Sequence, residues 1–233
     1  YARAFLALLE KNSSAVLVDA GCWDGNNTAS YGKTVGASSV IGLDVVEAAA
    51  KKAKERGVKV LICDLNGKIP LKPATVDVVV ANHVIEHLYN VGGFLEELYR
   101  MLKPGGYLLL GTPNLASWHN IFALAMGRQP FSGPSVNLFS ESDAASELKA
   151  EKTACLMSEL ADKEEGEHAL GHIVVMTYRT LLKLIVSKGF VVERSFGFGY
   201  HPFPPVIAGL LAAADKRHSH YVLVKARKPG KSL

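Results

Sequence analysis

The chain has 233 residues, 48% hydrophobic and 21% charged, so it can bury a substantial core and does not have the composition of a disordered protein. It has no apolar run long enough to cross a membrane and no signal-peptide pattern, and its three cysteines are too few and too scattered for a disulfide framework or a cysteine-ligated metal site. The net charge of +4 combines an acidic stretch at 132–171 with scattered basic residues elsewhere, which favours solvated surfaces over a nucleic-acid interface; we expect a cytoplasmic protein.

Short apolar runs alternate with helical patterns in the first half of the chain, and this alternation predicts a mostly parallel sheet. A helical fragment at 1–10 comes before the first run. The helix at 92–102 carries apolar residues on one face and is followed by a glycine-rich stop signal. The expected strands are 15–20, 39–44, 58–64, 76–82 and 107–111, and the expected helices between them are 26–35, 46–56 and 92–102.

The second half of the chain interrupts this rhythm. An acidic stretch at 140–168 has helix-forming composition, and we interpret 114–170 as a helical cap inserted over the carboxyl edge of the sheet. Thr177 can cap a further helix, because its hydroxyl can accept a hydrogen bond from the first turn. We expect one domain over 1–233, with its last elements at 115–126, 177–188, 190–196, 206–214 and 220–226.

Acidic residues follow the first three strands. The first strand ends at Asp19 and leads into a loop with glycines at 21 and 25, while Asp44 and Asp64 follow the next two strands. Such an edge can bind a nucleotide, because a carboxylate after the second strand can accept from ribose hydroxyls and one after the third from an adenine amino group. A single aspartate of this kind is more often a turn or helix cap, but three around one glycine loop favour a ligand site.

Five segments in order carry a family resemblance: VDAGCWDG (18–25), GLD (42–44), CD (63–64), DVVVANHVIEHL (77–88) and LKPGGYLLLGTP (102–113). Together they resemble the motifs of class I S-adenosylmethionine-dependent methyltransferases. The pattern after residue 170 resembles the small-molecule branch that includes ubiquinone-biosynthesis O-methyltransferases. This resemblance implies an α/β fold: a seven-stranded, mostly parallel Rossmann-like sheet with helices on both faces and an antiparallel last strand.

The resemblance also assigns roles to particular residues. The loop after the first strand would wrap the methionine part of S-adenosylmethionine, and the later segments would bind its ribose, adenine and sulfonium. The family has glycine where this chain has Trp23, so the loop either bends differently or places an indole beside the cofactor. The implied cofactor residues are Asp19, Ala20, Gly21, Cys22, Trp23 and Gly25 for methionine, Asp44 for ribose, Val45, Cys63, Asp64 and Leu65 for adenine, and Asn82, His83 and His87 near the sulfonium.

The predicted function is methyl transfer from S-adenosylmethionine to an O, N or C nucleophile of a small molecule. The sulfonium is already activated, so we expect no metal; a base is needed only if the acceptor must lose a proton. His83, His87, His119 and His172 are candidates, and His83 is the catalytic residue we select. We predict no nucleic-acid partner, since the Pro-Pro-aromatic and Pro-Cys signatures of those enzymes are absent; the oligomeric state is left open.

Three other interpretations fit some of the same residues. A nicotinamide-dependent dehydrogenase shares the sheet, but its G-x-G-x-x-G loop is absent and acids near the loop would repel a pyrophosphate. The stretch from His83 to His87 matches the H-x-x-E-H spacing of a zinc protease class, yet it directly follows a buried strand. A non-catalytic S-adenosylmethionine-binding protein would use the same pocket, and the sequence hardly separates it from an enzyme.

Overall fold

Seven strands form one mixed sheet in the computed structural model of the chain, which describes residues 1–134 and 172–230. The sheet order is β3-β2-β1-β4-β5-β7-β6. Neighbours from β3 to β5 are parallel, whereas β7 runs antiparallel to both β5 and β6, as predicted for the last strand. The strands are β1 (Val16–Ala20), β2 (Ser39–Asp44), β3 (Lys59–Ile62), β4 (Val76–Asn82), β5 (Leu102–Pro113), β6 (Val191–Phe198) and β7 (Tyr221–Arg227).

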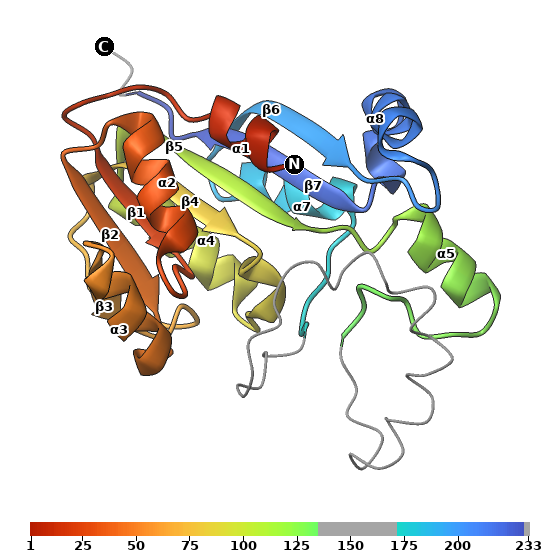
Figure 1. Ribbon diagram of the computed structural model, residues 1–233, viewed down its shortest axis with the longest axis horizontal. Coiled ribbons are helices and arrows are strands. Elements are labelled where there is room, and N and C mark those ends of the chain that lie inside the picture. The colour runs from red at the N-terminus through yellow and green to blue at the C-terminus, as the bar shows by residue number, and fades with distance from the viewer. Residues whose placement is uncertain (135–171, 231–233) are drawn as a thin grey trace.

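Helices cover both faces of this sheet. Figure 1 shows α1, α2 and α3 on one face, α4 and α7 on the other, and α5 and α8 beyond the ends of β5 and β6. None of the described helices is long and apolar enough to cross a membrane. The helices are α1 (Ala2–Ala7), α2 (Asn26–Val35), α3 (Glu47–Glu55), α4 (Val91–Met101), α5 (Trp118–Ala125), α7 (Tyr178–Ser187) and α8 (Pro205–Ala214), with the 3₁₀ helices η1 (Ile85–His87) and η2 (Lys216–His218).

The central strands are buried on both faces, which explains their nearly continuous apolar sequence. Along β4, Val78 and Val80 face the core under α1 and α2, while Val79 and Ala81 face the core under α4 and α7. Burial of each large aliphatic or aromatic side chain contributes about 1.5–3 kcal/mol. The rigid sheet that results fixes the strand ends from which a binding site can be built.

Most predicted boundaries agree with the structure to within two residues, but β5 is longer than the expected strand at 107–111. Leu102, expected in the preceding helix, pairs with Val76 of β4. The glycine stop signal is also part of the extended strand: the Gly105 N–H donates to the Lys228 carbonyl at 2.9 Å, and the Lys228 N–H donates to the Gly106 carbonyl at 2.9 Å. Pairing with β4 and hydrogen bonds to Lys228, just after β7, therefore extend β5 toward its N-terminal end, which no local sequence signal indicates.

The predicted cap at 114–170 is described in part. Its first helix is α5, within the expected 115–126, and the remainder of the cap from residue 135 lies outside the described residues. The segment just after β5 and the segment just before α7 lie side by side, because the Leu115 N–H donates to the Met176 carbonyl at 3.1 Å. Thr177 then caps α7 as predicted, with its side chain accepting from the Thr180 N–H.

Candidate functional site

The candidate site lies at the carboxyl ends of β1, β2 and β4. The order of the strands reverses between β1 and β4, since β2 and β3 follow β1 on one side while β4 and β5 lie on the other. In open α/β sheets ligands bind at this switch point, beyond the carboxyl ends of the strands. The predicted glycine loop and the segment after β4 are therefore neighbours in the fold.

The glycine loop after β1 needs its glycines. Gly21 has φ +80° and Gly25 has φ +79°, a left-handed conformation that residues with a Cβ rarely adopt. A Cβ on Gly21 would lie 2.5 Å from Val84 Cγ2, so the close approach of this loop to the segment after β4 also requires glycine. The N–H groups of Gly21 and Cys22 both donate to the Leu43 carbonyl, at 2.8 and 3.1 Å, and fix the loop against β2.

The backbone conformation of Trp23 bears on one of the two possibilities raised above, that the loop bends differently from a loop with glycine at this position. It adopts a positive φ of +46° in spite of its side chain, so the loop does not straighten to avoid that conformation. The left-handed conformation costs about 1–2 kcal/mol for a residue with a Cβ. A charge-assisted hydrogen bond offsets part of this cost, because the Trp23 N–H donates to Asp44 Oδ2 at 2.7 Å. The indole remains half exposed beside the loop.

Asp44 ends β2 and is only 7% exposed. Its carboxylate accepts from the Trp23 N–H and, at 2.9 Å, from the Val46 N–H. A carboxylate has about four acceptor positions, so two remain for a ligand such as a ribose diol. The next residue, Val45, is 54% exposed although it is apolar, and it offers an uncovered surface for a flat base.

Asp19 is the most deeply buried carboxylate beside the loop, with 3% exposure. Thr28 Oγ1 in the first turn of α2 donates to Asp19 Oδ2 at 2.5 Å. Burial raises the pKa of Asp19 to about 7; the Thr28 hydrogen bond lowers this pKa, and the charge of Asp44 raises it. A cation bound nearby would compensate the buried negative charge.

The third predicted group, Cys63 to Leu65, is divided between two environments. Asp64 lies two residues beyond the end of β3 and is exposed; its Oδ1 accepts from the backbone and side-chain N–H groups of Asn66, as in a turn cap. The Leu65 side chain is buried in the core under α4. Cys63 is the nearest of the three to Asp44, because its N–H donates to the Asp44 carbonyl at 3.0 Å.

A hydrogen-bonded chain orients His83 directly after β4. His83 has φ +54°, and its N–H donates to the Gly111 carbonyl of β5 at 2.9 Å. Its Nδ1 lies 3.2 Å from Glu86 Oε1, and a carboxylate can only accept, so in the neutral imidazole Nδ1 carries the proton and Nε2 the lone pair. Thr112 Oγ1 donates to Glu86 Oε2 at 2.9 Å. Burial alone would raise the pKa of Glu86, but hydrogen bonds led by that of His83 lower it.

Aromatic rings surround the exposed side of His83. The Tyr1 hydroxyl donates to Asn82 Oδ1 at 2.5 Å, and the Tyr1 ring lies 5.7 Å from His83, centroid to centroid. Tyr221 at the start of β7 meets His83 edge-on at 5.1 Å, and His220 stacks on Tyr221 at 4.1 Å. No motif in the sequence pointed to the two tyrosines.

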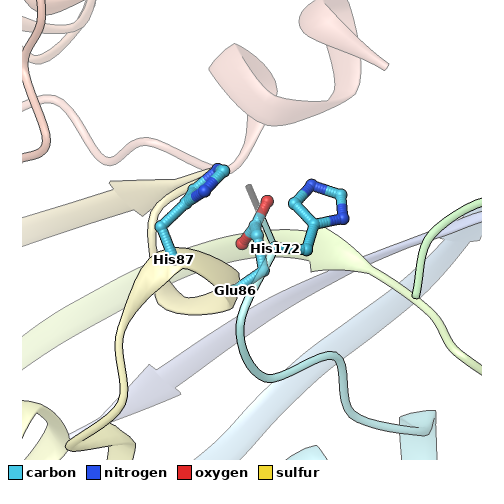
Figure 2. Close-up of side chains that lie close together, drawn as sticks. All are labelled: Glu86, His87 and His172. Carbon is cyan, nitrogen blue, oxygen red and sulfur yellow. The ribbon is translucent and has the colours of Figure 1, made fainter. Parts of the chain in front are cut away.

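The other histidines proposed as bases fall into two groups. His119 packs against His220 with ring centroids 4.3 Å apart, and burial lowers the pKa of His119 to about 4. His87 instead packs against His172 at 5.1 Å, and both lie beside Glu86 (Figure 2). Glu86 thus bonds to His83, and a carboxylate oxygen of Glu86 lies within 4.8 Å of a ring nitrogen of each histidine in this pair. It was missed as a site residue, although the H-x-x-E-H spacing contained it.

Comparisons with known proteins agree with this geometry. Residues 18–110 match the family model described as "Methyltransferase domain". A probable S-adenosylmethionine-dependent methyltransferase of Mycolicibacterium smegmatis is 41% identical over 102 residues, which cover 42% of this chain and 38% of the relative. The human mitochondrial ubiquinone biosynthesis O-methyltransferase is 34% identical over 196 residues, 80% of this chain and 44% of the relative. The chain thus spans less than half of either relative.

A solved structure supports the fold. The S-adenosylmethionine-dependent methyltransferase of Mesorhizobium loti superimposes with a TM-score of 0.60 over 97% of this chain and 96% of its own, at 20% sequence identity. At that identity the likeness concerns the fold alone. Residues 18–110 are thus similar in sequence to the methyltransferase domain of the S-adenosylmethionine-dependent class, and the sheet order agrees with that similarity.

Proposed function

We propose that this chain transfers a methyl group from S-adenosylmethionine to an O, N or C nucleophile of a small molecule by in-line displacement. The observation that carries the proposal is the pair of buried carboxylates, Asp19 and Asp44, on either side of the glycine loop. Asp19 would complement the sulfonium and ammonium charges of the methyl donor and would repel the pyrophosphate of a dinucleotide, while Asp44 would accept from the ribose hydroxyls.

The residues at the strand ends fit this cofactor. The glycine loop from Asp19 to Gly25 would hold its methionine part, and Asp44 its ribose hydroxyls through the two acceptor positions left open. Val45 offers an apolar surface to the adenine, with Cys63 next to it; Asp64 and Leu65 would contribute through their backbone. The bound cofactor supplies the transferable methyl group, and alignment of donor and acceptor can contribute about 7–11 kcal/mol to the rate.

His83 is the residue that we propose to take a proton from the acceptor. Its Nδ1–H is held by Glu86, so its Nε2 lone pair is free for an acceptor hydroxyl or amine. This is the orientation logic of a histidine held by a carboxylate in hydrolytic triads. Tyr1 and Tyr221 form aromatic walls beside the imidazole and favour a planar acceptor such as a phenol.

Calorimetry with S-adenosylmethionine, its demethylated product and a nicotinamide dinucleotide tests the cofactor assignment. We expect the first two to bind and the dinucleotide not to bind; failure of both adenosyl ligands at about millimolar concentration, where binding is worth only about 4 kcal/mol, would reject the proposal. A labelled-methyl assay over phenols, amines and carboxylic acids then separates an enzyme from a non-catalytic binding protein.

The role of His83 is tested by replacing it with glutamine, which keeps a polar group of similar size. For an acceptor that must lose a proton, we expect kcat to fall by about 10²–10⁴-fold. Cofactor affinity should stay within about threefold, a change of under 1 kcal/mol. Equal kcat in the two proteins would assign His83 a packing role, and the catalytic assignment would fail.

A further inference from the structure

Three histidine side chains from separate segments pack ring against ring near the start of β7. His119 belongs to α5, His201 to the loop between β6 and α8, and His220 to the position just before β7. The ring centroids of His119 and His220 are 4.3 Å apart, those of His201 and His220 5.0 Å, and those of His119 and His201 5.7 Å. These three residues are called the imidazole cluster below, and they join segments that are about 80 to 100 positions apart or adjoin them across β6 and β7.

The helix α5 has few other contacts that could hold it. Figure 1 shows it beyond the end of β5, away from the helices that cover the sheet. Its buried residues are Asn120 and Ala123, and neither is a large apolar side chain. Its ring contacts with the segments around β7 are all made to imidazoles: Trp118 lies 4.7 Å from His218, and His119 contacts the other two members of the imidazole cluster. The attachment of α5 therefore depends largely on histidine side chains.

The surroundings of the imidazole cluster favour the neutral form. Burial, together with the nearby His201, lowers the pKa of His119 to about 4. Burial lowers the pKa of His220 to about 3, and His119, His201 and His83 act in the same direction. The remaining titratable group against the cluster is Tyr221, which stacks on His220. Among the described residues, no carboxylate forms a hydrogen bond or ion pair with a member of the cluster, so a proton taken up there is not compensated.

Two neighbouring histidines show what a proton would meet. Nδ1 of His220 is buried and has no hydrogen-bond partner among the described residues. A protonated imidazole carries an N–H on both nitrogens, so this atom would become a buried donor without an acceptor, which is costly for a charged group. His218, by contrast, has its Nδ1 2.6 Å from Asp215 Oδ2, and a proton on its ring is therefore compensated.

We propose that the imidazole cluster is a pH-sensitive attachment for α5: the helix is held against the start of β7 at neutral pH, and it detaches locally in mildly acidic solution as His119 takes up a proton. Detachment moves the charged ring into water and away from the other imidazoles, and it leaves the sheet intact. The attachment does not depend on the proposed methyl transfer.

The direction of the effect follows from the lowered pKa. A histidine whose pKa is lowered in the attached state stabilises that state above its ordinary pKa of 6.5, and this contribution is lost as pH falls below 6.5. Each histidine released on detachment should therefore raise the detached population by about tenfold between about pH 7.5 and about pH 5.5.

Hydrogen exchange followed by mass spectrometry measures this population at both pH values, after correction for the intrinsic exchange rate. The protection of the α5 amides should fall by at least about tenfold, whereas that of α4, which is packed in the core, should change little. Unchanged protection of α5, or an equal fall in α4, would overturn the proposal. This comparison within the unaltered chain needs no variant.

Two matched variants assign the effect to its residue. His119→Phe keeps an aromatic ring that cannot take up a proton, so the fall in α5 protection should be about tenfold smaller than in the unaltered chain. His218→Phe makes the same change at the histidine that is paired with Asp215, and the fall should remain. Circular dichroism will establish that both variants are folded. An equal fall in His119→Phe and the unaltered chain would refute the role of His119.

Discussion

Asp19→Asn should change how stability depends on pH. Burial raises the pKa of Asp19 from its usual value of 3.8 to about 7. A carboxyl group whose pKa is raised in the folded state stabilises the fold below its unfolded pKa, and this contribution is lost as pH rises through the folded pKa. Asparagine keeps an oxygen that can accept from Thr28 and never ionises. The variant should therefore lack the part of the pH dependence that Asp19 causes.

The magnitude follows from the shift. From about pH 5 to about pH 8, the free energy of unfolding that the raised pKa of Asp19 contributes falls by the equivalent of roughly two pKa units. At 1.36 kcal/mol per unit, this is about 2.7 kcal/mol. Urea denaturation at both pH values measures the free energy of unfolding of Asp19→Asn minus that of the unaltered chain. This difference should be larger at the higher pH by about the same amount. Parallel pH profiles for the two proteins would refute the conclusion that Asp19 is a neutral acid at low pH.

The pH dependence of cofactor binding is a second measurement of the ionisation of Asp19. A cationic methyl donor favours ionised Asp19, so binding below pH 7 should release a proton, and affinity should rise by up to about tenfold per pH unit toward 7. Calorimetry in two buffers of different ionisation enthalpy measures that proton. In Asp19→Asn this release should disappear. A proton release that is unchanged in the variant would assign it to another group.

Three further substitutions have defined outcomes. Asp44→Ala should weaken binding of S-adenosylmethionine by about 1.5–3 kcal/mol in calorimetry, the range for a hydrogen bond to a charged group; unchanged affinity would refute the ribose role. Gly21→Ala should lower the free energy of unfolding by at least about 1–2 kcal/mol in urea denaturation, because φ is +80° and the added Cβ meets Val84; full stability would contradict this geometry. Thr112→Val should cost about 1–3 kcal/mol by leaving buried Glu86 short of a donor, whereas Thr112→Ser should stay near the stability of the unaltered chain; full stability of Thr112→Val would show that the hydroxyl does not matter.

The arrangement of the glycine loop and the strand-end carboxylates could be predicted from the sequence, for a physical reason. Strand, glycine loop and strand-end carboxylate are local patterns, and parallel strands bring their carboxyl ends to one edge whatever the helices do. Asp19, Gly21 and Asp44 therefore lie together as expected. Asp64 shows the limit of the pattern, because it caps a turn two residues beyond its strand.

The surroundings of His83 depend on contacts between distant segments, which periodicity does not reveal. Tyr1 reaches Asn82 across 81 positions of sequence, and Tyr221 reaches His83 only because β7 pairs with β5. Glu86 lay inside a recognised spacing, yet its bonds to His83 and Thr112 could be found only from the fold. Trp23 was predicted to be unusual, and a hydrogen bond from its backbone explains how the loop accommodates it.

The hydrogen bond between Leu115 and Met176 has a consequence for how this protein can diversify. This backbone hydrogen bond joins the two ends of the intervening segment, so the segment is a loop whose ends are held together. Doubling the length of such a loop costs only about 0.6 kcal/mol in closure entropy. A longer or shorter segment between Leu115 and Met176 would therefore be accommodated at little cost to the sheet.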